Sequence, residues 1–168
     1  MILSSVNDNS ILIIMNMDTY IAVKTAFSMF GTFMKDTAEI IGWEKVLELR
    51  EKKGYQNGEA VVAFFKSHNP ETRLIEFAAM NEEWYNRSGW NIETKASETE
   101  CISTVHTCPM FDGYLESGLS VEQANNICKA LHRGIDKRVK VDFPDGSFTS
   151  QVKKSKEDSC IEKYTIPT

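Results

Sequence analysis

The sequence predicts an α+β fold in which N-terminal helices pack on a small antiparallel sheet, with two further helices between the strands. Apolar residues recur every three or four positions in the first half of the chain, as on the buried stripe of a helix. From Trp90 onward, apolar and polar residues alternate, as they do in half-buried strands. A length of 168 residues suits one compact core, so we expect a single domain over residues 1–168.

In the first half, the apolar stripe predicts a long helix that begins near Asp18, whose side chain can cap it. The same spacing continues from Trp43, and Gly54 supplies the left-handed residue that commonly ends a helix. We expect a third helix after Asn57. The stripe of the long helix consists of Val23, Ala26, Phe27, Phe30, Phe33, Met34, Ala38 and Ile41.

Another helix follows the pair Asn69-Pro70, a cap with a first-turn proline, and the tripeptide Arg87-Ser88-Gly89 ends it. Two strands are then predicted within residues 90–107, joined by a polar turn at residues 95–99. Together these segments place a helix directly before a β-hairpin.

The last third of the chain returns to a helix and then to strands. Ser120 and Gln123 form a capping box, after which the apolar residues keep helical spacing to Ile135. Residues 139–143 alternate like a strand into the turn Pro144-Asp145-Gly146. The remaining strand residues are Phe148 on the return strand, and Cys160, Glu162, Tyr164 and Ile166 on one face of the last strand.

The charge balance narrows the range of partners. The chain has 19 basic and 24 acidic residues, and its net charge of -5 repels phosphate backbones and anionic lipid, so we expect no nucleic-acid partner. The longest apolar run, residues 11–15, is far shorter than the ~20 residues that span a bilayer. The N-terminus also lacks the basic region of a secretory signal, so we expect no membrane association and a cytoplasmic location.

In a reducing compartment, the cysteines are expected to be thiols or metal ligands rather than disulfides. Cys108, Cys128 and Cys160 fall on three elements: just after a strand, inside a helix and at the start of the final strand. If the fold gathers them, three thiolates and one nitrogen or oxygen ligand form a tetrahedral site suited to zinc, or to iron for redox chemistry. His132, four residues after Cys128, and His106, two before Cys108, are the candidate nitrogen ligands.

A simpler interpretation competes with the metal site. Free cysteine usually behaves as a small buried hydrophobe, so for each thiol taken alone we favour core packing. Cys101 alternates with Ser103 and Val105 and is interpreted as a packed strand residue. His106 and His132 are likewise more often surface or partly buried residues than ligands.

Motifs of serine hydrolases, nucleotide-binding folds and zincin proteases do not occur in this sequence. A nucleophilic thiol or a metal-bound water remains as the source of chemistry. Cys108 meets part of the requirement for a thiolate, because a helix is expected to start at Pro109 and His106 is near. A metal would instead lower the pKa of bound water to ~7. The residues leave both alternatives open.

The C-terminal half resembles the L-2-amino-thiazoline-4-carboxylate hydrolase-like family. The resemblance rests on four stretches: His106-Thr107-Cys108-Pro109, Glu116-Ser117-Gly118-Leu119, Ile127-Cys128, and Asp158-Ser159-Cys160-Ile161-Glu162-Lys163-Tyr164. The N-terminal half agrees more loosely through Ile41-Gly42-Trp43-Glu44, Lys53-Gly54 and Asn57-Gly58-Glu59. A more distant similarity is to vinyl-reductase-type ligand-binding domains, small-molecule sensors with a cysteine-bound zinc. Both families imply helices packed on a small antiparallel sheet.

The resemblance implies hydrolysis of a carbon–nitrogen bond in a cyclic amidine, thiazoline or other sulfur-containing metabolite, as in secondary metabolism. It carries over Cys108, Cys128 and Cys160 as site residues. The family often has an acidic residue shortly after the helical cysteine, where Lys129-Ala130-Leu131 stand here, and we assign that role to His132. It often has a glycine before the last cysteine, where this chain has Glu157-Asp158-Ser159.

Three hypotheses follow. The first is a cytoplasmic hydrolase of a small heterocyclic substrate, with the three cysteines and His132 around one metal or one reactive thiol. The second is a small-molecule-binding or sensor domain whose cysteine-bound zinc is structural. The third is a homo-oligomeric scaffold that uses the aromatic-rich residues 27–33 and 61–65 as its interface, although such faces are more often plain core.

Overall fold

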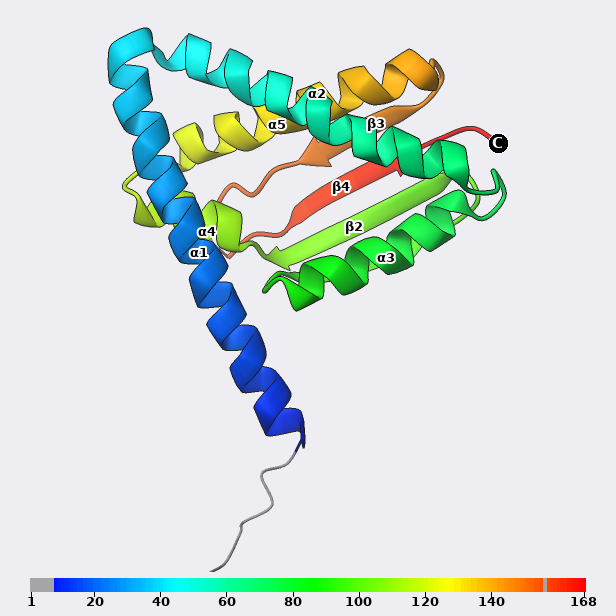
Figure 1. The fold of residues 1–168 in the computed structure, drawn as a ribbon, viewed down its shortest axis with the longest axis horizontal. Coiled ribbons are helices and arrows are strands. Elements are labelled where there is room, and N and C mark those ends of the chain that lie inside the picture. Colours follow the sequence, from blue (N-terminus) through cyan, green and yellow to red (C-terminus); the bar gives the residue numbers. More distant parts are fainter. Residues whose placement is uncertain (1–7, 156) are drawn as a thin grey trace, which may run out of the picture.

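The computed structural model describes residues 8–155 and 157–168. Within them, five helices surround a four-stranded antiparallel sheet, which confirms the predicted α+β class (Figure 1). The helices are α1 (Asp8–Ile41), α2 (Trp43–Ser67), α3 (Arg73–Arg87), α4 (Pro109–Glu116) and α5 (Val121–Asp142). The strands are β1 (Asn91–Ala96), β2 (Glu100–Thr107), β3 (Ser147–Gln151) and β4 (Cys160–Thr165).

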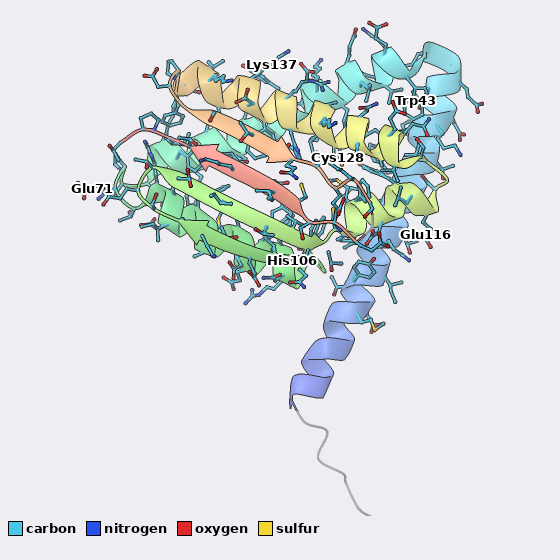
Figure 2. The ribbon with its side chains drawn as sticks, turned by 180° about the vertical axis from the view of Figure 1, so that it is seen from behind. Trp43, Glu71, His106, Glu116, Cys128 and Lys137 are labelled. Atoms are coloured by element: carbon cyan, nitrogen blue, oxygen red, sulfur yellow. The ribbon has the colours of Figure 1, made fainter. Side chains whose placement is uncertain are left out.

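The sheet has the strand order β1-β2-β4-β3, and every neighbouring pair is antiparallel. The predicted hairpin is β1–β2, and the two further helices between strands are α4 and α5. One face of the sheet is covered by α2 and α3, as Figure 1 shows, and the opposite face looks outward in Figure 2. On β2, Cys101, Ser103 and Val105 are buried on the covered face, so the predicted alternation sets which side chains reach the interior.

The first two helices differ from the prediction at their boundaries. The structure places the start of α1 at Asp8, so the prediction that Asp18 begins and caps this helix is wrong. Neither glycine nor proline occurs between the two positions, and nothing in the sequence stops the helix there. The true break is Gly42, whose φ of 83° suits glycine and separates α1 from α2.

Gly54 does not end a helix, because α2 continues from Trp43 to Ser67, and the helix expected after Asn57 is its second half. A Cβ atom added at Gly54 would lie 1.9 Å from the carbonyl oxygen of Leu131 on α5. On the facing helix, a Cβ at Gly134 would lie 2.0 Å from the carbonyl oxygen of Glu51. The glycines therefore allow α2 and α5 to approach until their backbones touch.

The strand expected at residues 139–143 is also wrong. Helix α5 continues through Asp142, and Phe143 is its C-cap. Val139 is fully buried and follows Ile135 and Leu131 at four-residue intervals, so the apolar alternation at this point was the end of a helical stripe. The capping box of Ser120 and Gln123 at the start of α5 is confirmed.

Edge strand β1 is protected by side chains of α3. The Asn86 side chain accepts a hydrogen bond from the Ile92 N–H and donates one to the Ile92 carbonyl. Glu82 accepts a hydrogen bond from the Thr94 N–H at 2.7 Å. These bonds satisfy backbone groups that would otherwise be free to pair with another strand. They also tie α3 to the sheet, which fixes one wall of the interior.

None of the helices that the structure describes is long and apolar enough to span a membrane. Large apolar side chains are exposed along α1, among them Met29, Phe33 and Ile40. Phe65 in the other aromatic-rich segment is fully buried in the core. A homo-oligomer remains a prediction, and α1 is the part of that prediction with exposed apolar surface.

Candidate functional site

A pocket of about 730 Å³ lies between α2 and α3 on one side and the sheet and α5 on the other. Its lining along α2 extends from Arg50 to Phe64, which corresponds to about 20 Å at 1.5 Å per residue. Aromatic and aliphatic side chains form most of its walls. Both the volume and the few polar groups in an apolar lining are typical of pockets that bind small organic molecules.

Three of the four cysteines line this pocket: Cys108, Cys128 and Cys160. Cys108 is the N-cap of α4, and its sulfur accepts a hydrogen bond from the Phe111 N–H at 3.4 Å. Because β2 pairs with β4, Cys160 lies opposite Val105, which precedes Cys108 by three residues in the chain. Helix α5, on which Figure 2 labels Cys128, brings this residue to the same pocket. Tertiary structure thus gathers three thiols that are distant in sequence.

The environment of these thiols keeps them protonated. Burial raises the pKa of Cys108 to about 11, although the Phe111 N–H, Lys153 and Trp90 favour the thiolate. Burial also raises the pKa of Cys128 and of Cys160 well above its ordinary value, and neighbouring thiols and Glu162 add to the effect. The helix start at Pro109 is confirmed, but its effect on Cys108 is smaller than the cost of burying a charged sulfur.

We expect the native protein to resist thiol alkylation. At pH 8 a pKa of about 11 leaves about one Cys108 thiol in a thousand ionised, and Cys101 has the same raised value because it is buried. Reaction with iodoacetamide, followed by mass spectrometry, should be slow for the native protein and fast for all four cysteines in urea. A single cysteine that reacts within minutes in the native protein would contradict this expectation.

The charged centre of the pocket is formed by Glu162 and His132, a pair that sequence analysis did not identify. The Oε1 atom of Glu162 lies 3.3 Å from Nε2 of His132, and Nδ1 of His132 lies 2.6 Å from the hydroxyl of Ser150. Ser150 and Glu162 are direct cross-strand partners on β3 and β4, and α5 holds His132 against both. Glu162 and His132 line the pocket, whereas Ser150 does not.

The hydrogen-bond pattern assigns roles to the three groups. The Ser150 hydroxyl and Nδ1 of His132 share a hydrogen bond, and Nε2 of the same ring faces the Glu162 carboxylate at 3.3 Å. The Glu162 carboxylate keeps free acceptor positions toward the pocket. Among the described residues that line the pocket, Glu162 is the sole carboxylate, so it is the group best placed to accept a proton or to hold a cation.

Lys153 lies at the site, and the side chain of His106 does not. Lys153 is only 2% exposed, lines the pocket and donates a hydrogen bond to the His106 carbonyl at 3.0 Å. The ring of His106 is not brought to the thiols, because it lies beside Ser159 and Glu93 on the outward face of the sheet (Figure 2).

The donor groups of the pocket do not form a metal site. Among the side chains that the structure describes, no three from His, Cys, Asp and Glu converge closely enough to hold a metal ion. The arrangement of Cys108, Cys128, Cys160 and His132 therefore does not fit zinc or iron.

A signal for Glu162 was nevertheless present in the sequence. It shares one face of the predicted last strand with Cys160 and Tyr164. A buried acidic residue is costly unless it is paired or functional. An acidic residue on a strand face shared with buried residues is therefore a candidate site residue. The partner Ser150 carried no comparable signal, because it stands among ordinary strand residues.

Fold and site together define the class of protein: an α+β protein whose helices close a largely apolar pocket over one face of an antiparallel sheet. Comparison of the chain with protein-family models, curated proteins and solved structures finds no match. The resemblance to the hydrolase-like family therefore stays a prediction, and the function is argued from the pocket itself.

Proposed function

We propose that this protein hydrolyses a carbon–nitrogen bond in a small cyclic amidine or thiazoline-like molecule that is held in the main pocket. The observation that carries the proposal is the Glu162–His132–Ser150 arrangement, which presents one carboxylate to a largely apolar pocket of about 730 Å³. A carboxylate is a group that can accept a proton from water in general-base catalysis.

In the proposed reaction, Glu162 accepts a proton from a water molecule while the oxygen of that water molecule bonds to the amidine carbon. The carbon–nitrogen double bond gives its electron pair to nitrogen, which takes the proton from Glu162, and a neutral tetrahedral adduct with one hydroxyl group forms. The Glu162 carboxylate then accepts the hydroxyl proton and passes it to the leaving nitrogen: the oxygen pair forms the carbonyl as the carbon–nitrogen bond breaks with its pair going to nitrogen, so the carboxylate is regenerated and one water molecule is consumed. His132, whose Nε2 lies 3.3 Å from Oε1 of Glu162, holds the carboxylate in position throughout.

The thiols have a different role in this proposal. Because Cys108, Cys128 and Cys160 are protonated and buried, they form a polarisable wall that suits a sulfur-containing ring. No covalent bond to sulfur is needed. This assignment moves the proposed chemistry from the cysteines to Glu162, although the cysteines still shape the pocket.

The proposal is tested by incubating the purified protein with L-2-amino-thiazoline-4-carboxylate and following ring opening by NMR and mass spectrometry. We expect a product heavier by one water molecule. Cys108→Ala and Cys160→Ala should each retain turnover within about tenfold, since neither thiol makes or breaks a bond. Absence of ring opening across a panel of cyclic amidines would reject the hydrolase.

The second candidate is a small-molecule-binding or sensor domain, and one observation favours it. The pocket walls are mostly apolar and the thiols are protonated, which suits binding at least as well as catalysis. Under this proposal ligands bind without turnover.

A further inference from the structure

Three aromatic rings stand together at one wall of the pocket. Trp84 and Trp90 stack with ring centroids 6.5 Å apart and an interplanar angle of 30°. Tyr85 meets both rings edge-on, at 4.9 Å from Trp84 and 5.3 Å from Trp90. All three line the pocket, and Trp84 is 59% exposed. We call these residues the aromatic wall.

The aromatic wall lies close to the Glu162 carboxylate. Phe77 on α3 meets Tyr164 on β4 with ring centroids 5.2 Å apart. Tyr85 lies about 12 Å further along α3, and Glu162 and Cys160 lie about 7 and 13 Å back from Tyr164 on the same face of β4, so this end of α3 lies over both residues. Burial and then the charge of Glu162 raise the pKa of Tyr85. The wall and the carboxylate therefore border the same part of the pocket.

The chemistry of these groups favours the binding of a positively charged ligand. Faces of Trp and Tyr attract positive charge through their quadrupoles, and the attraction grows when water is excluded. One oxygen of Glu162 is engaged by His132, and its side chain is 20% exposed, so the carboxylate remains accessible from the pocket. An ionised carboxylate opposite aromatic faces is favourable for an ammonium, amidinium or guanidinium group and unfavourable for an anion.

Two cations of the chain also border the pocket and would favour an anion instead. The guanidinium of Arg50 donates to the Tyr114 hydroxyl at 3.1 Å and lies 5.5 Å from the ring centroid of Phe30, and the Phe27 ring stands between Tyr114 and Trp90. Lys153 donates to the carbonyl of His106, at the end of β2. Its charge lowers the pKa of Cys108 and of Cys160, whereas the charge of Glu162 raises the pKa of both thiols and of Tyr85.

We propose that the pocket recognises organic cations with a flat apolar body, holding the cationic group between Glu162 and the aromatic wall of Trp84, Tyr85 and Trp90. The inference deepens the proposed function, since both use Glu162, but it concerns binding and does not require turnover. A protein that binds cations and hydrolyses nothing would reject the hydrolase and retain this inference.

The test is calorimetric titration of the full chain with three probes of the same shape: benzamidine as the cation, benzamide as the neutral form and benzoate as the anion. We expect benzamidine to bind at least about tenfold more tightly than either of the others. Glu162→Gln should remove that preference while leaving benzamide binding unchanged. Trp84→Leu, at an exposed position that the fold does not need, should weaken benzamidine more than benzamide.

Glu83→Gln is the matched control, because Glu83 precedes Trp84 on α3 but pairs with Arg87 on the surface and does not line the pocket. It should preserve the preference for benzamidine. Equal binding of the three probes, tighter binding of benzoate, or no binding of any probe would overturn the inference. Tighter binding of benzoate would assign recognition to Lys153 or Arg50. Unchanged discrimination in Glu162→Gln would also overturn it.

Discussion

Gly54→Ala is expected to lower the free energy of unfolding by at least about 3 kcal/mol, which is a large share of the stability of a domain this size. In an ordinary helix interior the same change stabilises by about 0.5–1 kcal/mol. Here the added methyl group would meet the Leu131 carbonyl oxygen at 1.9 Å, and a backbone atom cannot rotate away. The two helices would have to separate, which opens the interior along the pocket.

Urea unfolding followed by circular dichroism measures this effect, and Gln56→Ala on the exposed side of α2 serves as the control. The control should change stability by less than about 0.5 kcal/mol. Gly134→Ala should behave like Gly54→Ala, because its added carbon would lie 2.0 Å from the Glu51 carbonyl oxygen. A Gly54→Ala protein as stable as the wild type would show that α2 and α5 do not touch in this way.

Glu162→Gln is expected to reduce turnover of the proposed substrate by about a hundredfold to ten-thousandfold, the usual cost of losing a general base. The amide keeps the size of the side chain and can still accept a hydrogen bond from His132, so folding should be retained. The measurement is the rate of ring opening at saturating substrate, with the circular dichroism spectrum as a check on structure.

Two further variants separate a catalytic role from a structural one. Glu93→Gln, on the exposed outward side of β1, removes the same charge elsewhere and should leave turnover unchanged. Ser150→Ala should cost about tenfold, because Ser150 is a positioning residue that fixes the His132 tautomer, and the loss should depend on pH. Full turnover in Glu162→Gln would remove the carboxylate from the mechanism.

Much of the fold was predictable because local periodicity decides it. The capping box at Ser120, the hairpin after Trp90 and the helix start at Pro109 are short-range signals, and the structure confirms each of them. The predictions were wrong where a local sequence signal reflected a tertiary contact. Gly54 resembles a helix end in sequence, but in the structure it is a contact point with α5. Apolar residues near Val139 alternate as they would in a strand, but in the structure they are the last positions of the buried stripe of α5.

The candidate site was predictable only in part. Cys108, Cys128 and Cys160 stand out in the sequence as possible partners, and tertiary structure brings them to one pocket. Their protonation could not be predicted, since it depends on how much apolar surface surrounds each sulfur.

By itself, the sequence determined which faces of the helices and strands are apolar, because side-chain spacing follows from backbone geometry and needs no knowledge of partners. It thereby determined the α+β class and the position of Glu162 on the same strand face as Cys160 and Tyr164. Only the tertiary structure decided that Glu162 meets His132 and Ser150, that Lys153 is buried and that His106 is not at the site. Such contacts join residues far apart in the chain, and their geometry depends on the pairing of β4 with β3 and the packing of α5.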